Sequence, residues 1–391
     1  MSAYTPIMAT TRVLYREAAR TCRSIDRLTT HALATRQVNA MLIHWLDAGA
    51  ASLLPQAAAL IHANNGEVAL GPLCRAAFRA ADGSLDLGFK ALRSLGGIQQ
   101  WLQVNSALNQ LLDTGASVEQ GASVISDEVC RLLIDDPAEH PAERMLAPGP
   151  CLPFVEAQLD EIAARVRERA GILASPDASH LHRLTSISAV MYGELGFVGC
   201  FDDVVRGSSL RHVLQRRRGL PILLTTVYAG VASRLGIQLS HTNFPNRVLL
   251  RLEGEAGEPP CFVDAFAQGE ILSPDMCESF LCSLGIPVEA HGRFTQPVEP
   301  RLVWSRMLRN LAHRTQAGDE APVLTRESWA AMGLGLETDM SADPLAQQLE
   351  QQAEIAMERV DGLVATLSED EYRGLVANRQ KLSPQRDSVV Q

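Results

Sequence analysis

The chain contains the residue types of thiol chemistry, but their spacing fits no familiar site. Its eight cysteines are scattered, without a C-x-x-C pair or a Cys/His cluster of zinc-binding spacing, so no metal site is predicted. Thiol catalysis uses a cysteine at a helix N-terminus, a histidine that takes its proton and an acid that orients the histidine. Candidates are His241, Cys261 close before Asp264, and Cys200 in a predicted loop. Neither Cys261 nor Cys200 opens a predicted helix, so a nucleophile built from them would need an unusual geometry.

The elements that would position these groups change in character after Gly236. Helical spacing of apolar residues predicts helices at 155–170 and 180–195 before this point. The next helix, Pro221–Leu235, is apolar on most faces and is therefore expected to be buried. Short runs rich in β-formers then predict three strands, at 237–242, 247–252 and 261–266. Helical patterns return at 301–313 and 343–366.

Several segments in this half resemble the bacterial SirB1-like proteins, which have a transglutaminase core. They are Tyr192-Gly193-Glu194-Leu195-Gly196-Phe197, Arg216-Arg217-Arg218-Gly219-Leu220-Pro221-Ile222, Asn243-Phe244-Pro245, Phe262-Val263-Asp264-Ala265-Phe266 and Met307-Leu308-Arg309-Asn310-Leu311. The resemblance implies a papain-like α+β fold, in which an apolar helix and two following strands carry the Cys, His and Asp positions.

The resemblance also implies that the catalytic set is degenerate here. Pro221 aligns with the position where catalytic relatives carry cysteine, and Arg247 aligns with the histidine. Arginine cannot act as a general base near neutral pH. Asp264 remains, either as a remnant of the catalytic acid or, in the interpretation we favour, as an acid that caps a turn or pairs with Arg247. We therefore predict no catalytic residues in this set.

The first half of the chain resembles the LYR-motif family of small three-helix mitochondrial proteins. The segment Leu14-Tyr15-Arg16 opens a predicted helix, Arg20 follows one turn later, and Arg75, Phe78 and Arg79 reproduce a later motif of that family. A plain amphipathic helix with solvated arginines is the alternative. The gap between Leu14 and Phe78 exceeds the usual family spacing and would require an insertion.

This second resemblance implies partners rather than catalysis. LYR proteins bind acyl carrier protein through these basic residues and accommodate the acyl chain on its phosphopantetheine arm between their helices. We expect no intrinsic cofactor, but such an arm is a possible bound group. Six arginines in residues 1–36 would fit a mitochondrial import signal, or equally an ordinary basic helix. A net charge of −10 argues against nucleic-acid binding, and no apolar run reaches membrane-spanning length.

Together these patterns predict a multidomain protein. An all-α LYR-like domain (1–134) and a Pro-rich linker (135–150) would precede an α+β transglutaminase-like domain (151–313) and a helical extension with a tail (314–391). The expected function is that of a non-catalytic accessory or assembly subunit of a mitochondrial respiratory complex, binding acyl carrier protein or neighbouring subunits. The alternatives are a thiol hydrolase or acyltransferase with non-standard residues, and a bacterial cytoplasmic SirB1-like protein.

Overall fold

The computed structural model describes residues 13–24, 103–134, 150–170, 180–200, 204–254 and 258–314, apart from single residues at 14, 22, 105 and 246. Its named helices are α6 (Val118–Ile134), α8 (Cys151–Ala170), α9 (His180–Ser188), η3 (Ala189–Glu194), α10 (Val204–Gly207), α11 (Leu210–Arg216), α12 (Pro221–Arg234), α13 (Pro274–Ser283), η4 (Val288–Ala290), α14 (His291–Thr295) and α15 (Pro300–Arg314). Its strands are β1 (Val198–Gly199), β2 (Arg218–Gly219), β3 (Ser240–His241), β4 (Leu250–Leu252), β5 (Cys261–Asp264) and β6 (Glu270–Leu272). The described part is therefore of mixed helix and strand content, and mostly helical.

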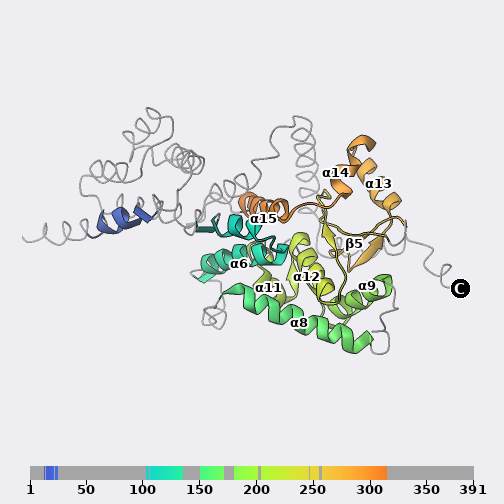
Figure 1. The fold of residues 1–391 in the computed structure, drawn as a ribbon, viewed down its shortest axis with the longest axis horizontal. Helices are drawn as coiled ribbons and strands as arrows, with labels where there is room; N and C mark the ends of the chain where they lie inside the picture. The colour runs from blue at the N-terminus through green and yellow to red at the C-terminus, as the bar shows by residue number, and fades with distance from the viewer. Residues whose placement is uncertain are drawn as a thin grey trace, which may run out of the picture.

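Helix α12 forms the centre of the fold. It is apolar nearly all round, from Pro221 through Ala232, and almost every one of those side chains is buried. A helix without a polar face has to be covered on all sides. Helices α6, α8, α9 and α11 pack around it, and Figure 1 shows it between α8 and the strand β5. The burial predicted for this segment is confirmed.

The antiparallel sheet β3-β4-β5-β6 separates two apolar clusters. Alternation along β5 places Val263, paired with Leu250, in the main core around α12. Phe262 lies in a smaller cluster with Leu281 of α13 and Phe294 of α14. The strands are shorter than the sequence pattern predicts, and only 250–252 of the predicted 247–252 join the ladder. Arg247 therefore precedes β4 rather than belonging to it.

Helix α6 belongs to the same core although it precedes the predicted linker. It packs against α8 and α15, and the indole Nε1 of the fully buried Trp304 donates to the Val118 carbonyl at 3.0 Å. A Cβ on Gly121 would come within 2.1 Å of the Trp304 ring, so only glycine permits this approach. The predicted domain boundaries remain a prediction, but within the described residues α6 packs into the same core as α8, α12 and α15.

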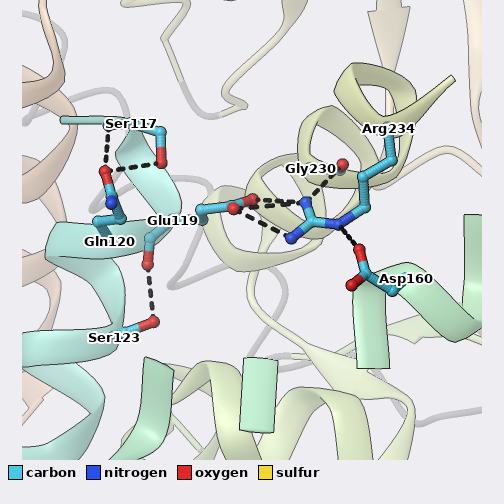
Figure 2. Close-up of polar contacts among 7 residues, drawn as sticks. All are labelled: Ser117, Glu119, Gln120, Ser123, Asp160, Gly230 and Arg234. Carbon is cyan, nitrogen blue, oxygen red and sulfur yellow. Dashed lines mark hydrogen bonds and ion pairs between the residues drawn. The ribbon is translucent and has the colours of Figure 1, made fainter. Parts of the chain in front are cut away.

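A polar contact joins the end of α12 to the start of α6 and to the middle of α8 (Figure 2). Arg234, at the end of α12, donates through Nε to Asp160 at 2.5 Å and through Nη1 to Glu119 at 3.2 Å. Its side chain is only 18% exposed, and Nη1 also donates to the Gly230 carbonyl. One guanidinium thus holds two carboxylates from different helices, which suits its planar set of donors.

Candidate functional site

The first of the three aligned positions is the start of α12. Pro221 is the first residue of that helix and is buried, and Leu220 before it has an extended backbone with φ −66° and ψ 156°. Proline suits this position because its fixed φ matches the helix and its missing N–H has no helical partner there. At the position where catalytic relatives carry a nucleophile, Pro221 therefore has a structural role, which is to start α12.

Thr225 ties this helix start to the segment that carries the second position. Its hydroxyl lies 2.7 Å from the Pro221 carbonyl oxygen and 3.0 Å from the Val248 carbonyl oxygen. Val248 directly follows Arg247, so the first two aligned positions approach each other through one buried hydroxyl. The Thr225 hydroxyl thus links the start of α12 to the segment beside Arg247.

Arg247 and Asp264 form an ion pair at the third position. The Arg247 Nη1 lies 2.5 Å from Oδ2 of Asp264, whose side chain is 1% exposed against 26% for Arg247. The other carboxylate oxygen accepts the backbone N–H groups of Phe266 and Ala267, both at 3.0 Å. The turn cap and the Arg247 pairing that we favoured for Asp264 are both present. Both oxygens of this carboxylate accept from donors supplied by the chain itself.

A tyrosine that the sequence did not single out for a role supports this turn. Tyr192 lies in the π-helix η3 and donates its hydroxyl to the Ala265 carbonyl at 2.5 Å. Burial raises the pKa of Tyr192 well above its usual value, and the charges of Tyr228 and Asp264 add to the effect. The phenol therefore stays protonated and acts as a hydrogen-bond donor. Its only sequence signal was its place in a segment resembling SirB1-like proteins.

The thiols near this site are not activated. Burial raises the pKa of Cys277, on α13, to about 12, and the charge of Asp264 contributes to the rise. Burial also raises the pKa of the half-buried Cys261. Cys200 is buried beyond β1. Because thiolates are the nucleophilic form, the raised pKa values make Cys261 and Cys277 poor nucleophiles at neutral pH.

His241 does not form a catalytic pair with these thiols in the described part of the chain. It lies on β3, paired with Leu250, and burial lowers its pKa to about 4. Its Nε2 atom has no hydrogen-bond partner among the described residues. A thiol–imidazole contact does occur elsewhere, where Cys130 Sγ lies 3.9 Å from His212 Nδ1. No sequence motif indicated that contact, because its residues are 82 positions apart.

Metal-binding and membrane-spanning features are not seen in the described ranges. Across them, no three His, Cys, Asp or Glu side chains gather in a group that could hold a metal ion. None of the helices described is both long and apolar enough to cross a bilayer.

Part of the predicted partner-binding set lies outside the described residues, namely Leu14, Arg75, Phe78 and Arg79. Tyr15, Arg16 and Arg20 lie in the helical residues 13–24, where both arginines are exposed and Tyr15 is partly buried. Arg20 contacts Glu17 at 2.5 Å, an exposed pair within one helix.

The comparison with protein families settles what the second half of the chain is. Residues 154–309 match the model of the transglutaminase-like superfamily. They form a transglutaminase-like domain. The match includes all three aligned positions and begins within α8. This confirms that part of the predicted fold.

Curated relatives share this domain. F-box only protein 21 from Mus musculus is 32% identical over 155 residues, which are 37% of this chain and 24% of that protein. A UPF0162 protein from Pseudomonas aeruginosa is 30% identical over 193 residues, 48% of this chain and 66% of that protein. Protein SirB1 from Salmonella typhimurium is 32% identical over 108 residues, 27% of this chain and 38% of that protein. In each case the chain spans less than two thirds of the relative. No solved structure matches significantly.

These similarities bear differently on the two resemblances found in the sequence. The similarity to SirB1 and to a UPF0162 protein confirms the relationship predicted for the second half. The comparisons give no support to an LYR-motif domain or to a mitochondrial location, and both stay predictions.

Proposed function

We propose that the transglutaminase-like domain of this protein is a binding scaffold that does no covalent chemistry. The observation that carries the proposal is the Arg247–Asp264 ion pair at 2.5 Å, formed where a catalytic histidine would meet its acid. The guanidinium lies on the carboxylate oxygen that would otherwise orient a base, and the other oxygen caps the turn through two backbone N–H groups.

Each step of thiol catalysis lacks its group at the aligned positions. Pro221 offers no nucleophilic atom, and the guanidinium of an arginine such as Arg247 has donors but no acceptor with which to take a proton. The nearby thiols of Cys261 and Cys277 have raised pKa values, so little thiolate is present to replace the missing nucleophile. A hydrolase or acyltransferase using non-standard residues is the alternative, and it would need one of these thiols to be reactive.

A binding role is consistent with the occurrence of this domain in relatives of different overall length. The matched stretch makes up 24% of a mammalian F-box only protein and 66% of a bacterial UPF0162 protein. The same domain therefore occurs in chains of different overall organisation, as expected of a folded module that presents a surface to other proteins. We propose a protein partner rather than nucleic acid, in keeping with the net charge of −10.

The nature of the binding partner is a separate question, on which the two resemblances in the sequence differ. An accessory or assembly subunit of a mitochondrial complex, with acyl carrier protein as its partner, rests on a motif that lies largely outside the described residues. A SirB1-like protein of bacterial type fits the similarity to Salmonella SirB1 better, and it is the form of the scaffold proposal that we favour.

Thiol reactivity tests the proposal directly. The full-length protein would be treated in its native state with a low concentration of an electrophilic probe, and the labelled cysteines located by peptide mapping. The Cys282→Ser background removes an exposed thiol on α13 that labels irrespective of function. We expect no rapid labelling of Cys200, Cys261 or Cys277, and full labelling of all three after unfolding.

A gain-of-reactivity variant supplies the positive control. Pro221→Cys with Arg247→His places a thiol at the start of α12 and an imidazole beside Asp264. Rapid native labelling of Cys200, Cys261 or Cys277 in the parent protein, at a rate comparable to that of the new thiol, would sink the scaffold proposal and establish the enzyme alternative.

A further inference from the structure

Two buried thiols lie beside the first turn of α11, remote in sequence from the aligned triad positions. Cys130 of α6 places its Sγ 3.7 Å from the Ser209 Oγ and 3.9 Å from the His212 Nδ1. All three of these residues are less than a tenth exposed. The thiol of Cys130 therefore has an imidazole nitrogen within hydrogen-bonding range, in an enclosed setting.

Cys151, the first residue of α8, lies at the same junction. Its backbone N–H donates to Asp127 Oδ1 at 2.9 Å, and Asp127 is one helical turn before Cys130 on α6. A hydrogen bond from the Arg211 main chain acts on the Cys151 thiol, and Arg211 adjoins His212. Both thiols therefore contact the same short stretch of α11.

The two thiols differ in character. Burial, with smaller contributions from Cys130 and Asp127, raises the pKa of Cys151 to about 12. Cys151 is thus a protonated thiol in a closed position. Cys130 has a histidine ring nitrogen 3.9 Å from its sulfur, and in the tautomer that carries its proton on Nε2 this nitrogen accepts the thiol proton, the arrangement that generates a thiolate in cysteine chemistry.

We propose that Cys130 is an oxidation-sensitive thiol that closes a disulfide bond with Cys151 and so links α6 to α8. The oxidant is a peroxide. This modification is separate from the scaffold role of the triad region and does not depend on it.

The reaction proceeds in two steps. The His212 imidazole takes the proton of Cys130, and the thiolate sulfur attacks one peroxide oxygen. The O–O bond breaks, the leaving oxygen takes the proton back from the imidazolium, and Cys130 becomes a sulfenic acid. As the Cys151 sulfur attacks the Cys130 sulfur, the departing hydroxide takes the Cys151 proton, so a thiol that burial keeps protonated can complete the step. The S–O bond breaks, and the released hydroxide with that proton leaves as water. Two thiols are oxidised and one peroxide is reduced.

The measurement is peptide mapping of the full-length protein after brief treatment with hydrogen peroxide and trapping of the remaining thiols. We expect a cross-linked peptide joining Cys130 and Cys151, and its loss after reduction with dithiothreitol. The oxidised protein should also melt at a higher temperature than the reduced protein, because the bond restricts the unfolded chain.

Two variants assign the roles. Cys151→Ser should leave Cys130 as a sulfenic acid that a dimedone probe captures, and His212→Asn should slow the formation of the bond at least about tenfold, as expected for loss of a general base. Cys200→Ser is the matched control, because it removes a buried thiol of the same domain outside this junction. Circular dichroism on each variant confirms folding.

Peroxide treatment of the protein without any substitution is enough to refute the proposal. If native protein treated with peroxide shows Cys130 unchanged, or joined to another cysteine, the junction is a packed pair of thiols without redox function. An unchanged rate in folded His212→Asn would remove the role of the imidazole.

Discussion

Removing the Arg247 guanidinium should destabilise the domain far more than removing an arginine from its surface. In Arg247→Met the Asp264 carboxylate stays 1% exposed but loses the cation 2.5 Å away. A buried charge left without its partner is costly, because water cannot replace the lost interaction.

The structure sets the size of this effect. Breaking a fully buried pair typically costs about 3–5 kcal/mol. Arg247 is 26% exposed, so the pair is partly screened by solvent, and Oδ1 of Asp264 keeps its hydrogen bonds to Phe266 and Ala267. We therefore expect a loss of about 2–4 kcal/mol for Arg247→Met. In Asp264→Asn the amide oxygen can still accept the turn N–H groups and Arg247 can turn to solvent, so the loss should be smaller, about 1–2 kcal/mol.

The assay is urea unfolding followed by circular dichroism, with midpoints compared at equal slope. Arg165→Met is the matched control, because Arg165 pairs with Glu161 on the surface of α8 with both side chains about half exposed. That pair should be worth less than about 0.5 kcal/mol. If Arg247→Met unfolds at the same urea concentration as Arg165→Met, or if Asp264→Asn is the more damaging of the two changes, the carboxylate does not depend on Arg247 and the account of the site is wrong.

Three further outcomes follow from the same geometry. Pro221→Cys with Arg247→His should gain rapid labelling by a thiol probe, at least about tenfold faster than Pro221→Cys alone, because the imidazole would deprotonate the new thiol; equal rates would show that the two positions do not meet. The His241 pKa is about 4 in the folded protein against 6.5 for a free side chain, so the unfolded state takes up a proton first as the pH falls. Stability present above pH 6.5 should therefore decline toward pH 4 by up to about 3 kcal/mol, and His241→Gln should flatten that slope in parallel unfolding titrations. Gly121→Ala should reduce the free energy of unfolding by at least about 2 kcal/mol, and so lower the melting temperature, because the added methyl group clashes with Trp304. A variant that melts like the parent would mean that α6 and α15 can move apart without cost.

Local sequence patterns were enough to predict the main elements of the transglutaminase-like domain. The run from Pro221 to Ala232 is mostly apolar on every face of the helix, with Thr225 and Thr226 as its short polar side chains, so its burial follows from composition. The Arg247–Asp264 pair was predictable because the resemblance aligned opposite charges at adjoining catalytic positions.

Other features depend on contacts that no local pattern records. The π-helix at Ala189–Glu194 is wound more widely than an α-helix, with hydrogen bonds from i to i+5, so the α-helical period does not predict the direction of Tyr192 toward Ala265. The contact of Trp304 with Val118 spans 186 residues, and it depends on a small residue at Gly121 that carries no signal by itself. The paired stretches β1 and β2 are two residues long, too short for strand alternation to show.

The guanidinium of Arg234 has a practical consequence for anyone who excises or transplants this domain. The family match begins at residue 154, whereas Arg234 reaches back to Glu119 on α6. A fragment cut at that match would lose α6, uncover the face of Trp304 that contacts it, and leave a largely enclosed arginine with Asp160 as its remaining carboxylate. The part that folds is thus longer than the part that is recognisably shared, and a stable fragment should begin before Val118.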